Sequence, residues 1–178
     1  TGKVLQGDAY FPALNAQGEA SAQVFSSSPS GGGDSMLLMY LLAITAAEET
    51  IDLSASYFVP DDLTRSALNA ALERGVHVRI IVPGEHIDAF NVRLASRYHY
   101  GELLDAGVSI YEYRPTMLHN KVMVVDGIWS TIGSINFVNR SMKKNAEVNV
   151  AVYDRPFAAR VEAMVRADLG ECDVLTKT

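Results

Sequence analysis

Four polar residues of complementary chemistry interrupt the apolar segment LHNKVMVVDGIWSTIGSIN, residues 118–136, and they are His119, Lys121, Ser134 and Asn136. An ammonium, a hydroxyl and a carboxamide would surround an imidazole with hydrogen-bond donors, which suits a phosphoryl oxygen. Histidine titrates near neutral pH and is a competent nucleophile at phosphorus. A lone structural histidine is the alternative, but the grouping of polar types favours a phosphate site built around a nucleophilic imidazole.

The spacing within this segment predicts a β-hairpin that gathers the polar groups. Asp126-Gly127 lies between two apolar runs, and a tight primed turn needs residues that tolerate positive φ. With a two-residue turn, residues 125 and 128 face each other, and so do residues 119 and 134. Alternation along a strand then puts Met123 and Ser130 on one face, with the four polar side chains at its far end. Gly133, which has no side chain, permits close approach of another backbone.

Strands and helices alternate along the rest of the chain, which predicts an α/β layered domain with a largely buried sheet. Period-2 alternation and apolar runs place strands at 23–26, 51–59, 76–83, 108–113 and 147–153. Capping residues, acidic first turns and terminal glycines place helices at 34–49, 61–74, 88–106 and 155–169. These elements must position the polar hairpin.

Composition narrows the classes of protein to which the chain can belong. It has 178 residues, 48% hydrophobic and 20% charged, which suits one globular domain with a sizeable core. The net charge of −6 provides no overall positive field for nucleic acid. The single Cys172 excludes an intrachain disulfide framework and a zinc site made of several thiolates. The longest apolar run, 36–47, is too short to cross a bilayer, and the opening at Thr1 suggests part of a longer polypeptide.

The polar positions of the hairpin resemble the signature of the phospholipase D superfamily, and they read His119-x-Lys121-x4-Asp126-x6-Gly133-Ser134-x-Asn136. The flanks SYFVPDDL, RGVHVRIIVPG, ASRYHYGELLDAGVSIYEY and NRSMKKNAEVNVAVYD are similar to the C-terminal half of bacterial cardiolipin synthases. The resemblance runs from about Asp8 and implies a phospholipase D-like fold, a mixed β-sheet flanked by helices on both faces. Residues 1–21 would be the lead-in that joins two halves, and residues 22–178 the C-terminal catalytic half-domain.

This resemblance implies phosphodiester exchange through a covalent phosphohistidine. His119 would attack phosphorus and expel an alcohol, while Lys121, Ser134 and Asn136 hold the phosphoryl oxygens. Glu147 stands where the family has a carboxylate that orients the imidazole, with an ordinary surface strand residue as the alternative. The chemistry, as the family performs it, requires no metal and no cofactor.

Asp126 belongs to the motif and is grouped with its catalytic residues, yet the predicted hairpin places it in the turn. There it would hydrogen-bond backbone groups, and this structural role is favoured over a chemical one. A second departure is Ser56, because the cardiolipin synthases commonly have proline before the Tyr-Phe pair. The basic residues Arg140 and Lys143-Lys144 follow the motif and suit either a solvated loop or a contact with an anionic head group.

The family site uses two such motifs, and this chain contains one. The second histidine is therefore expected from a missing N-terminal half or from a second copy in a homodimer. The resemblance implies an anionic phospholipid substrate, peripheral membrane contact in the full-length protein, and a bacterial protein that is cytoplasmic or membrane-associated; a nucleic-acid partner is not expected. The alternatives are a dimeric nuclease of the same superfamily and a catalytically silent half-domain. Hydrolysis and transfer remain equally compatible with the residues.

Overall fold

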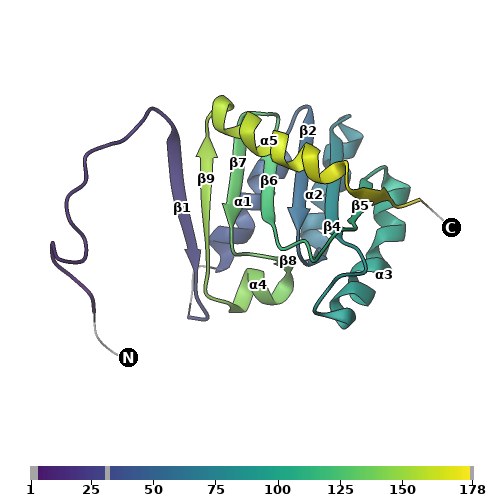
Figure 1. Ribbon diagram of the computed structural model, residues 1–178, viewed down its shortest axis with the longest axis horizontal. Coiled ribbons are helices and arrows are strands. Elements are labelled where there is room, and N and C mark those ends of the chain that lie inside the picture. Colours follow the sequence, from purple (N-terminus) through teal and green to yellow (C-terminus); the bar gives the residue numbers. More distant parts are fainter. Residues whose placement is uncertain (1–3, 31–32, 177–178) are drawn as a thin grey trace.

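The computed structural model describes residues 4–30 and 33–176, which form a layered α/β domain (Figure 1). Its strands are β1 (Ser21–Ser27), β2 (Thr50–Ala55), β3 (Phe58–Val59), β4 (His77–Pro83), β5 (Ser109–Tyr113), β6 (Lys121–Val125), β7 (Trp129–Gly133), β8 (Phe137–Val138), β9 (Glu147–Tyr153) and β10 (Cys172–Val174). Its helices are α1 (Gly33–Ala46), α2 (Asp62–Glu73), α3 (Phe90–Ala106), α4 (Asn139–Lys144) and α5 (Arg155–Leu169).

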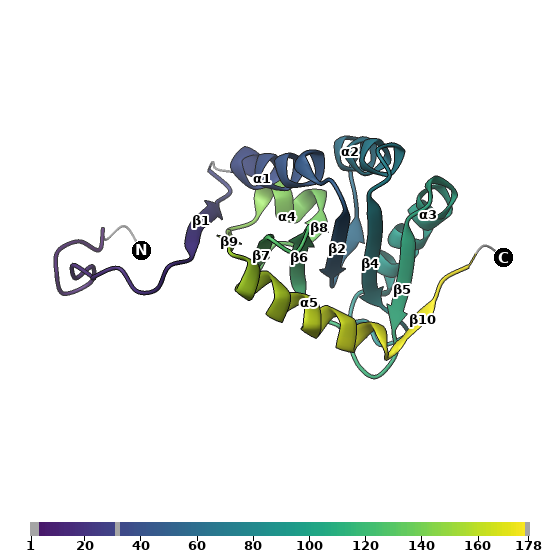
Figure 2. The same cartoon turned by 90° about the horizontal axis from the view of Figure 1, so that it is seen from above.

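Eight strands form one mixed sheet in the order β1-β9-β7-β6-β2-β4-β5-β10. Strands β2, β4 and β5 are parallel, and the remaining neighbours are antiparallel. The short strands β3 and β8 pair in a separate parallel ladder. Helix α5 crosses one face of the sheet, while α1, α2, α3 and α4 lie on the other (Figure 2). The expected mixed sheet with helices on both faces is therefore confirmed.

Local signals in the sequence set most element boundaries. Helix α2 begins after Asp61, whose carboxylate accepts the Thr64 N–H, and α5 begins after Asp154, whose carboxylate accepts the Phe157 N–H. Helix α3 ends at Gly107, which has a φ of +105° that a side chain would disfavour. Strand β4 is apolar on both sides because helices cover both faces of the sheet: Ile80 packs in one hydrophobic cluster and Ile81 in another.

The expected strand at 51–59 is interrupted, and this correction matters for the site. Strand β2 ends at Ala55, and the Ser56 N–H donates to the carbonyl oxygen of Asn120. The chain then leaves the main sheet, and β3 pairs with β8. The short elements β8, α4 and β10 were not expected from the sequence. Their pairing and packing partners are distant in the chain, so no local pattern announces them.

The register of the β6–β7 hairpin differs by one residue from the expected one. The primed turn is present, with φ of +51° at Asp126 and +60° at Gly127, and Ile128 N–H donates to Val125 O. However, Val125 pairs with Trp129, so Ile128 is an extra residue; its carbonyl accepts the Asp154 N–H instead. Met123 consequently pairs with Thr131, and Ser130 and Ile132 lie on the opposite face from the predicted one. By the same alternation Ser134 does not share a face with Lys121, so that prediction is wrong; the two residues instead lie at the same end of the sheet, where β6 begins and β7 ends.

The lead-in projects away from the body of the domain before the chain enters β1 (Figure 1). Its large apolar side chains Tyr10, Phe11 and Leu14 are exposed. The first residues of the expected lead-in, 1–3, lie outside the described residues. Within the described ranges, no helix combines the length and the apolar character that a membrane span requires.

Gly133 at the end of β7 generates a test of this fold. A Cβ added there would lie 2.1 Å from Asn149 Oδ1 and 2.4 Å from Val148 O. Asn149 cannot withdraw easily, because its buried Nδ2 donates to Tyr40 Oη and Thr131 Oγ1. Gly133→Ala is therefore expected to lower the free energy of unfolding by about 2–3 kcal/mol in urea denaturation.

Gly101→Ala is the matched control, because a Cβ there meets no atom within 4 Å and the position is helical. It should leave stability unchanged or raise it by up to about 1 kcal/mol. Equal midpoints for the two variants would contradict the close packing of β7 against β9.

Candidate functional site

The polar residues of the motif collect at one edge of the sheet. The parallel strands β2 and β4 end there, β6 begins there with Lys121, β7 ends there before Ser134, and β9 begins there with Glu147. This is the lower edge in Figure 1. In open α/β sheets, ligands bind outside the carboxyl ends of the parallel strands, so the position suits a binding site.

Lys121 is a buried cation at this edge. Its Nζ donates to Ser56 Oγ at 2.6 Å and to the carbonyl oxygen of His119 at 3.1 Å. Burial lowers the pKa of Lys121 below that of an ordinary lysine, and the negative charges of Glu147 and Asp88 partly oppose this shift. A desolvated ammonium with spare hydrogen-bonding capacity is attracted strongly to an entering anion.

Ser134 and Glu147 are joined directly. The Ser134 hydroxyl donates to Glu147 Oε2 at 2.5 Å and accepts the Val148 N–H at 3.0 Å. The other oxygen of Glu147 accepts a hydrogen bond from Asn145 Nδ2 at 3.1 Å. Among the described residues, the Glu147 carboxylate is therefore occupied by Ser134 and Asn145, and it makes no hydrogen bond to the His119 ring. Its expected role in orienting the imidazole stays a prediction.

His119 and Asn136 flank this group differently. His119 is exposed at the sheet edge, where its ring is open to an incoming substrate. Asn136 is half-buried and lines a cavity of about 710 Å³ together with Tyr57, His99 and Arg140. Its Oδ1 atom is buried and has no hydrogen-bond partner among the described residues. His119 thus lies at the surface, whereas Asn136 lines a cavity that His119, Lys121 and Ser134 do not line.

Asp126 lies in the turn at the opposite end of the hairpin, where it stabilises the local backbone. Its carboxylate accepts three backbone N–H groups, those of Glu48, Glu49 and Thr50, at 2.8–2.9 Å. These amides belong to the connection between α1 and β2, so the carboxylate replaces the acceptors that a longer helix would supply. This explains why α1 ends at Ala46 rather than at the expected residue 49.

Three residues at the edge were not identified as site residues from the sequence. Ser56 holds Lys121, and its hydroxyl also donates to the Asn120 carbonyl. Tyr57 donates to Asp88 Oδ1 at 2.5 Å, and this hydrogen bond raises the pKa of Tyr57 to about 12. Of the three, only Ser56 stood out in the sequence, because the cardiolipin synthases commonly have proline at this position. Nothing local to Tyr57 or Asp88 indicates that they meet.

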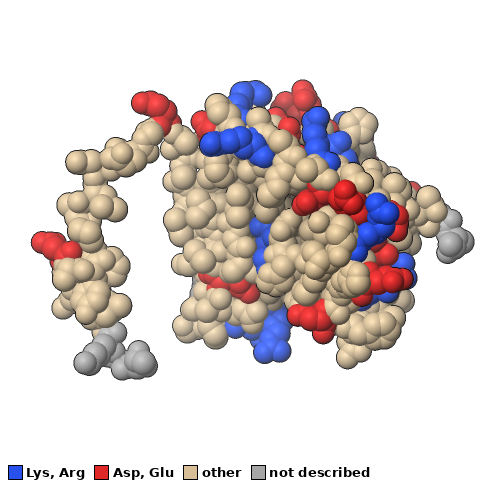
Figure 3. All heavy atoms as spheres, in the orientation of Figure 1, with Lys and Arg blue, Asp and Glu red and all other residues tan. Residues whose placement is uncertain are grey.

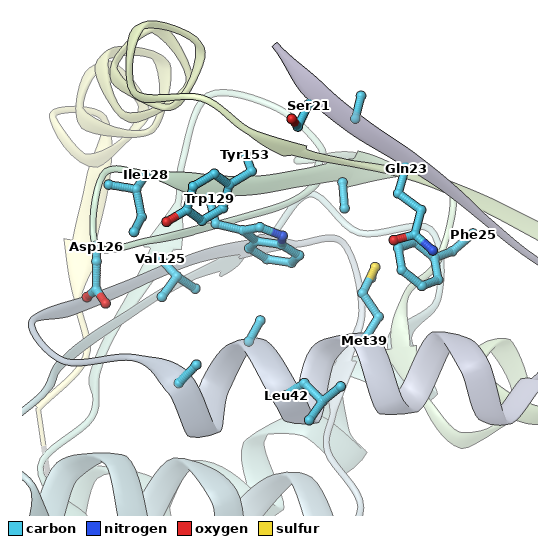
Figure 4. Close-up of a pocket in the computed structure, with 14 residues that line it drawn as sticks. Ser21, Gln23, Phe25, Met39, Leu42, Val125, Asp126, Ile128, Trp129 and Tyr153 are labelled. Atoms are coloured by element: carbon cyan, nitrogen blue, oxygen red, sulfur yellow. The ribbon is translucent and has the colours of Figure 1, made fainter.

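An apolar pocket of about 540 Å³ lies between α1 and β1, away from this edge (Figure 4). Trp129, Phe25 and Met39 point into it, and Leu42 borders it. Asp126 is the one predicted site residue that lines it. In the described part of the chain, no group of three or more His, Cys, Asp or Glu is placed to hold a metal ion.

Comparison with known proteins assigns the family. Residues 40–169 match the family described as cardiolipin synthase, PLD-like domain. The chain belongs to the phospholipase D superfamily. Cardiolipin synthase A of Pseudomonas aeruginosa is 39% identical over 160 residues, which cover 90% of this chain and 32% of that protein. A probable cardiolipin synthase of Bacillus subtilis is 38% identical over 143 residues, which cover 80% of this chain and 28% of that protein.

Solved structures share the fold of this domain. The phospholipase D family member Nuc of Salmonella typhimurium superposes with a TM-score of 0.76 at 25% identity, covering 89% of this chain and all of that one. The phosphatidylserine synthase of Haemophilus influenzae gives 0.69 at 17% identity, covering 88% of this chain and 40% of that one. This phospholipase D-like domain spans about a third of the length of the cardiolipin synthases it matches.

The contacts of Asp126 predict a graded loss of stability without damage to the site. Asp126→Asn keeps one acceptor and tolerates the positive φ, so it should cost about 1 kcal/mol of unfolding free energy; Asp126→Ala should cost about 3 kcal/mol. Inorganic phosphate binding at the strand edge, followed by NMR, should be unchanged in both. A loss of phosphate binding in a fully folded Asp126→Asn variant would contradict the structural role.

Proposed function

We propose that this domain supplies one half of a site that exchanges phosphodiester bonds of phospholipids, with His119 as the nucleophile. The observation that carries the proposal is the grouping of a buried Lys121, a Ser134–Glu147 pair and an exposed His119 at one sheet edge. Phosphoryl transfer needs positioning and charge stabilisation more than elaborate covalent chemistry. These side chains provide both.

In the proposed reaction, a ring nitrogen of His119 attacks phosphorus, and the P–N bond forms as the bond from phosphorus to the leaving alcohol oxygen breaks. A second histidine outside this chain gives that oxygen a proton. Water or an acceptor alcohol then gives up its proton to that histidine and attacks phosphorus, which releases His119. Lys121 and Asn136 would neutralise and hold the non-reacting oxygens throughout both steps.

The Ser134–Glu147 hydrogen bond suggests how substrate entry prepares the nucleophile. In the free domain the Ser134 hydroxyl is committed to Glu147 Oε2. If the hydroxyl turns to donate to a phosphoryl oxygen, this carboxylate oxygen becomes free. Glu147 could then accept a hydrogen bond from the His119 ring and stabilise the charge that develops on it. The expected orienting role of Glu147 would thus arise only with substrate bound.

An uncovered apolar strip supports the need for a second half. Four valine and isoleucine side chains form a row across neighbouring strands, from β6, which α5 covers, to the edge strand β1. They are Val122, Ile132, Val150 and Val24, and their exposed fractions are 5%, 39%, 38% and 65%. The surface over β1 and β9 is mostly free of charged atoms (Figure 3). Exposed patches of this kind mark protein interfaces, and a second copy of the chain or the missing half fits this face.

Phospholipid is the favoured substrate class. The cardiolipin synthases of Pseudomonas aeruginosa and Bacillus subtilis are 39% and 38% identical over 90% and 80% of this chain, and the net charge of −6 opposes the approach of a polynucleotide. A dimeric nuclease is the second candidate, because Nuc superposes over its whole length. The two candidates differ in substrate and can be separated by one set of assays.

The test uses an assembled site, either the full-length protein or a dimer of this chain, with phosphatidylglycerol vesicles and single-stranded DNA as substrates. His119→Ala should lower turnover of the lipid at least about 10³-fold, because it removes the nucleophile. His77→Ala is the matched control, since His77 is also exposed but begins β4 at the opposite edge. DNA cleavage without lipid turnover would replace the lipid proposal by the nuclease.

Sedimentation of the purified chain tests the half-site. Dimers should form through the β1–β9 strip, and Val150→Arg should abolish them, whereas Val174→Arg on β10, 61% exposed, should not. A strictly monomeric chain with robust diesterase activity would overturn the half-site proposal.

A further inference from the structure

The outer face of α3 carries a stripe of large apolar side chains. Phe90, Leu94 and Tyr98 are spaced four residues apart, and their exposed fractions are 63%, 55% and 81%. Residues at i, i+4 and i+8 share one helix face, so the three form a continuous strip. The side of α3 that packs on the domain instead uses Ser96, Tyr100 and Leu103. The helix is therefore apolar on a face that the domain leaves uncovered.

This stripe borders the cavity onto which Asn136 opens. The neighbouring α3 residues Asn91, Ala95 and His99 line that cavity of about 710 Å³, together with Asn136. Helix α3 begins shortly after β4 ends, at the same sheet edge that holds the motif residues (Figure 1). The stripe thus forms an outer rim of the candidate site rather than a distant surface.

Helix α4 forms another part of the rim and carries positive charge. Arg140 lines the cavity, and Arg140, Lys143 and Lys144 are exposed. None of these three takes part in an ion pair among the described residues. Of the two carboxylates that line the same cavity, Asp62 pairs with Arg65 at 2.6 Å, while Asp61 caps α2 and keeps its charge. The three unpaired cations of α4 therefore outnumber the one unpaired carboxylate that lines the cavity, Asp61, although the chain as a whole carries −6.

We infer that the α3 stripe and the basic residues of α4 dock this domain onto the surface of a bilayer that contains anionic phospholipid. Leu and aromatic side chains on a helix insert at the boundary between head groups and acyl chains. Lys and Arg beside them are attracted to anionic head groups. Docking in this orientation turns the carboxyl edge of β2 and β4, with His119, towards the lipid.

Two other occupants of apolar surface are possible and are separated by the experiment. The missing half or a second copy could cover the α3 stripe. Alternatively, the protein could contact lipid through a different surface, the pocket between α1 and β1 (Figure 4), which would then receive an acyl chain. Leu42 at the border of this pocket is 59% exposed. The basic residues of α4 beside the stripe favour the bilayer, because a purely apolar contact with a protein would not require positive charges next to it.

The experiment is co-sedimentation of the purified chain with vesicles of phosphatidylcholine alone or of phosphatidylcholine with phosphatidylglycerol. Binding is expected to the anionic vesicles and should weaken at high salt. Leu94→Gln should lower the partition coefficient about tenfold, and Lys143→Gln/Lys144→Gln about 25-fold. Circular dichroism and thermal melting establish that each variant is folded.

Matched controls use the same substitutions elsewhere. Leu42→Gln on α1 and Arg155→Gln/Arg160→Gln on α5 should each change the partition coefficient less than twofold. Absence of vesicle binding by the wild-type chain would overturn the docking proposal, and so would an equal loss in Leu42→Gln. A Leu94→Gln variant that keeps vesicle binding but loses dimerisation would assign the stripe to a protein partner.

The docking inference builds on the proposed lipid substrate, but vesicle binding is measured without turnover. Vesicle binding through α3 and α4, in an assembled protein that cleaves no lipid diester, would support docking and contradict the proposed function. Lipid turnover that is unaffected by the substitutions in α3 and α4 would support the proposed function and contradict the docking inference.

Discussion

The carboxylate of Asp126 fixes the hairpin on which the candidate site depends. It accepts three N–H groups from the connection between α1 and β2, while its own N–H donates to the Thr50 carbonyl. The turn is thereby locked to the neighbouring strand at one end of the sheet. Strands β6 and β7 must then deliver Lys121 and Ser134 to the other end in a defined register. The hydrogen bonds of Asp126, a motif residue far from the candidate site, thus explain how it influences where Lys121 and Ser134 lie.

Burial gives the residues at the edge their properties. Lys121 is a cation whose solvation has been replaced by Ser56 and a carbonyl oxygen, so a phosphoryl oxygen competes with few water molecules for it. Glu147 is held near by Ser134 and Asn145 and supplies the opposing charge. At this edge one buried cation therefore faces two carboxylates, Glu147 and Asp88, and the net charge of the chain does not describe this local arrangement.

Local patterns in the sequence predicted most of the architecture. Helix α5 and strand β9 occur at the expected residues because their caps and alternation are local signals. The hairpin register was wrong by one residue, because the extra Ile128 is stabilised by contacts with Asp154, far along the chain. The β3–β8 ladder joins residues 79 apart, such as Phe58 and Phe137, and gives no local sign. Ser56 and Asp88 were missed for the same reason: their roles exist only after β2, β4 and β6 have come together.

The most direct test of the account is an NMR titration of the chain with inorganic phosphate, observing the histidine rings and the backbone amides. The account predicts saturable shifts of the His119 ring and of the Ser134 and Val148 amides, which vanish in Lys121→Ala. A second cleft, lined by Arg93, Arg97 and Arg114, provides the contrasting location, although carboxylates already engage its arginines. Shifts confined to that cleft, with an unperturbed His119 ring, would contradict the assignment of the sheet edge as the phosphate site.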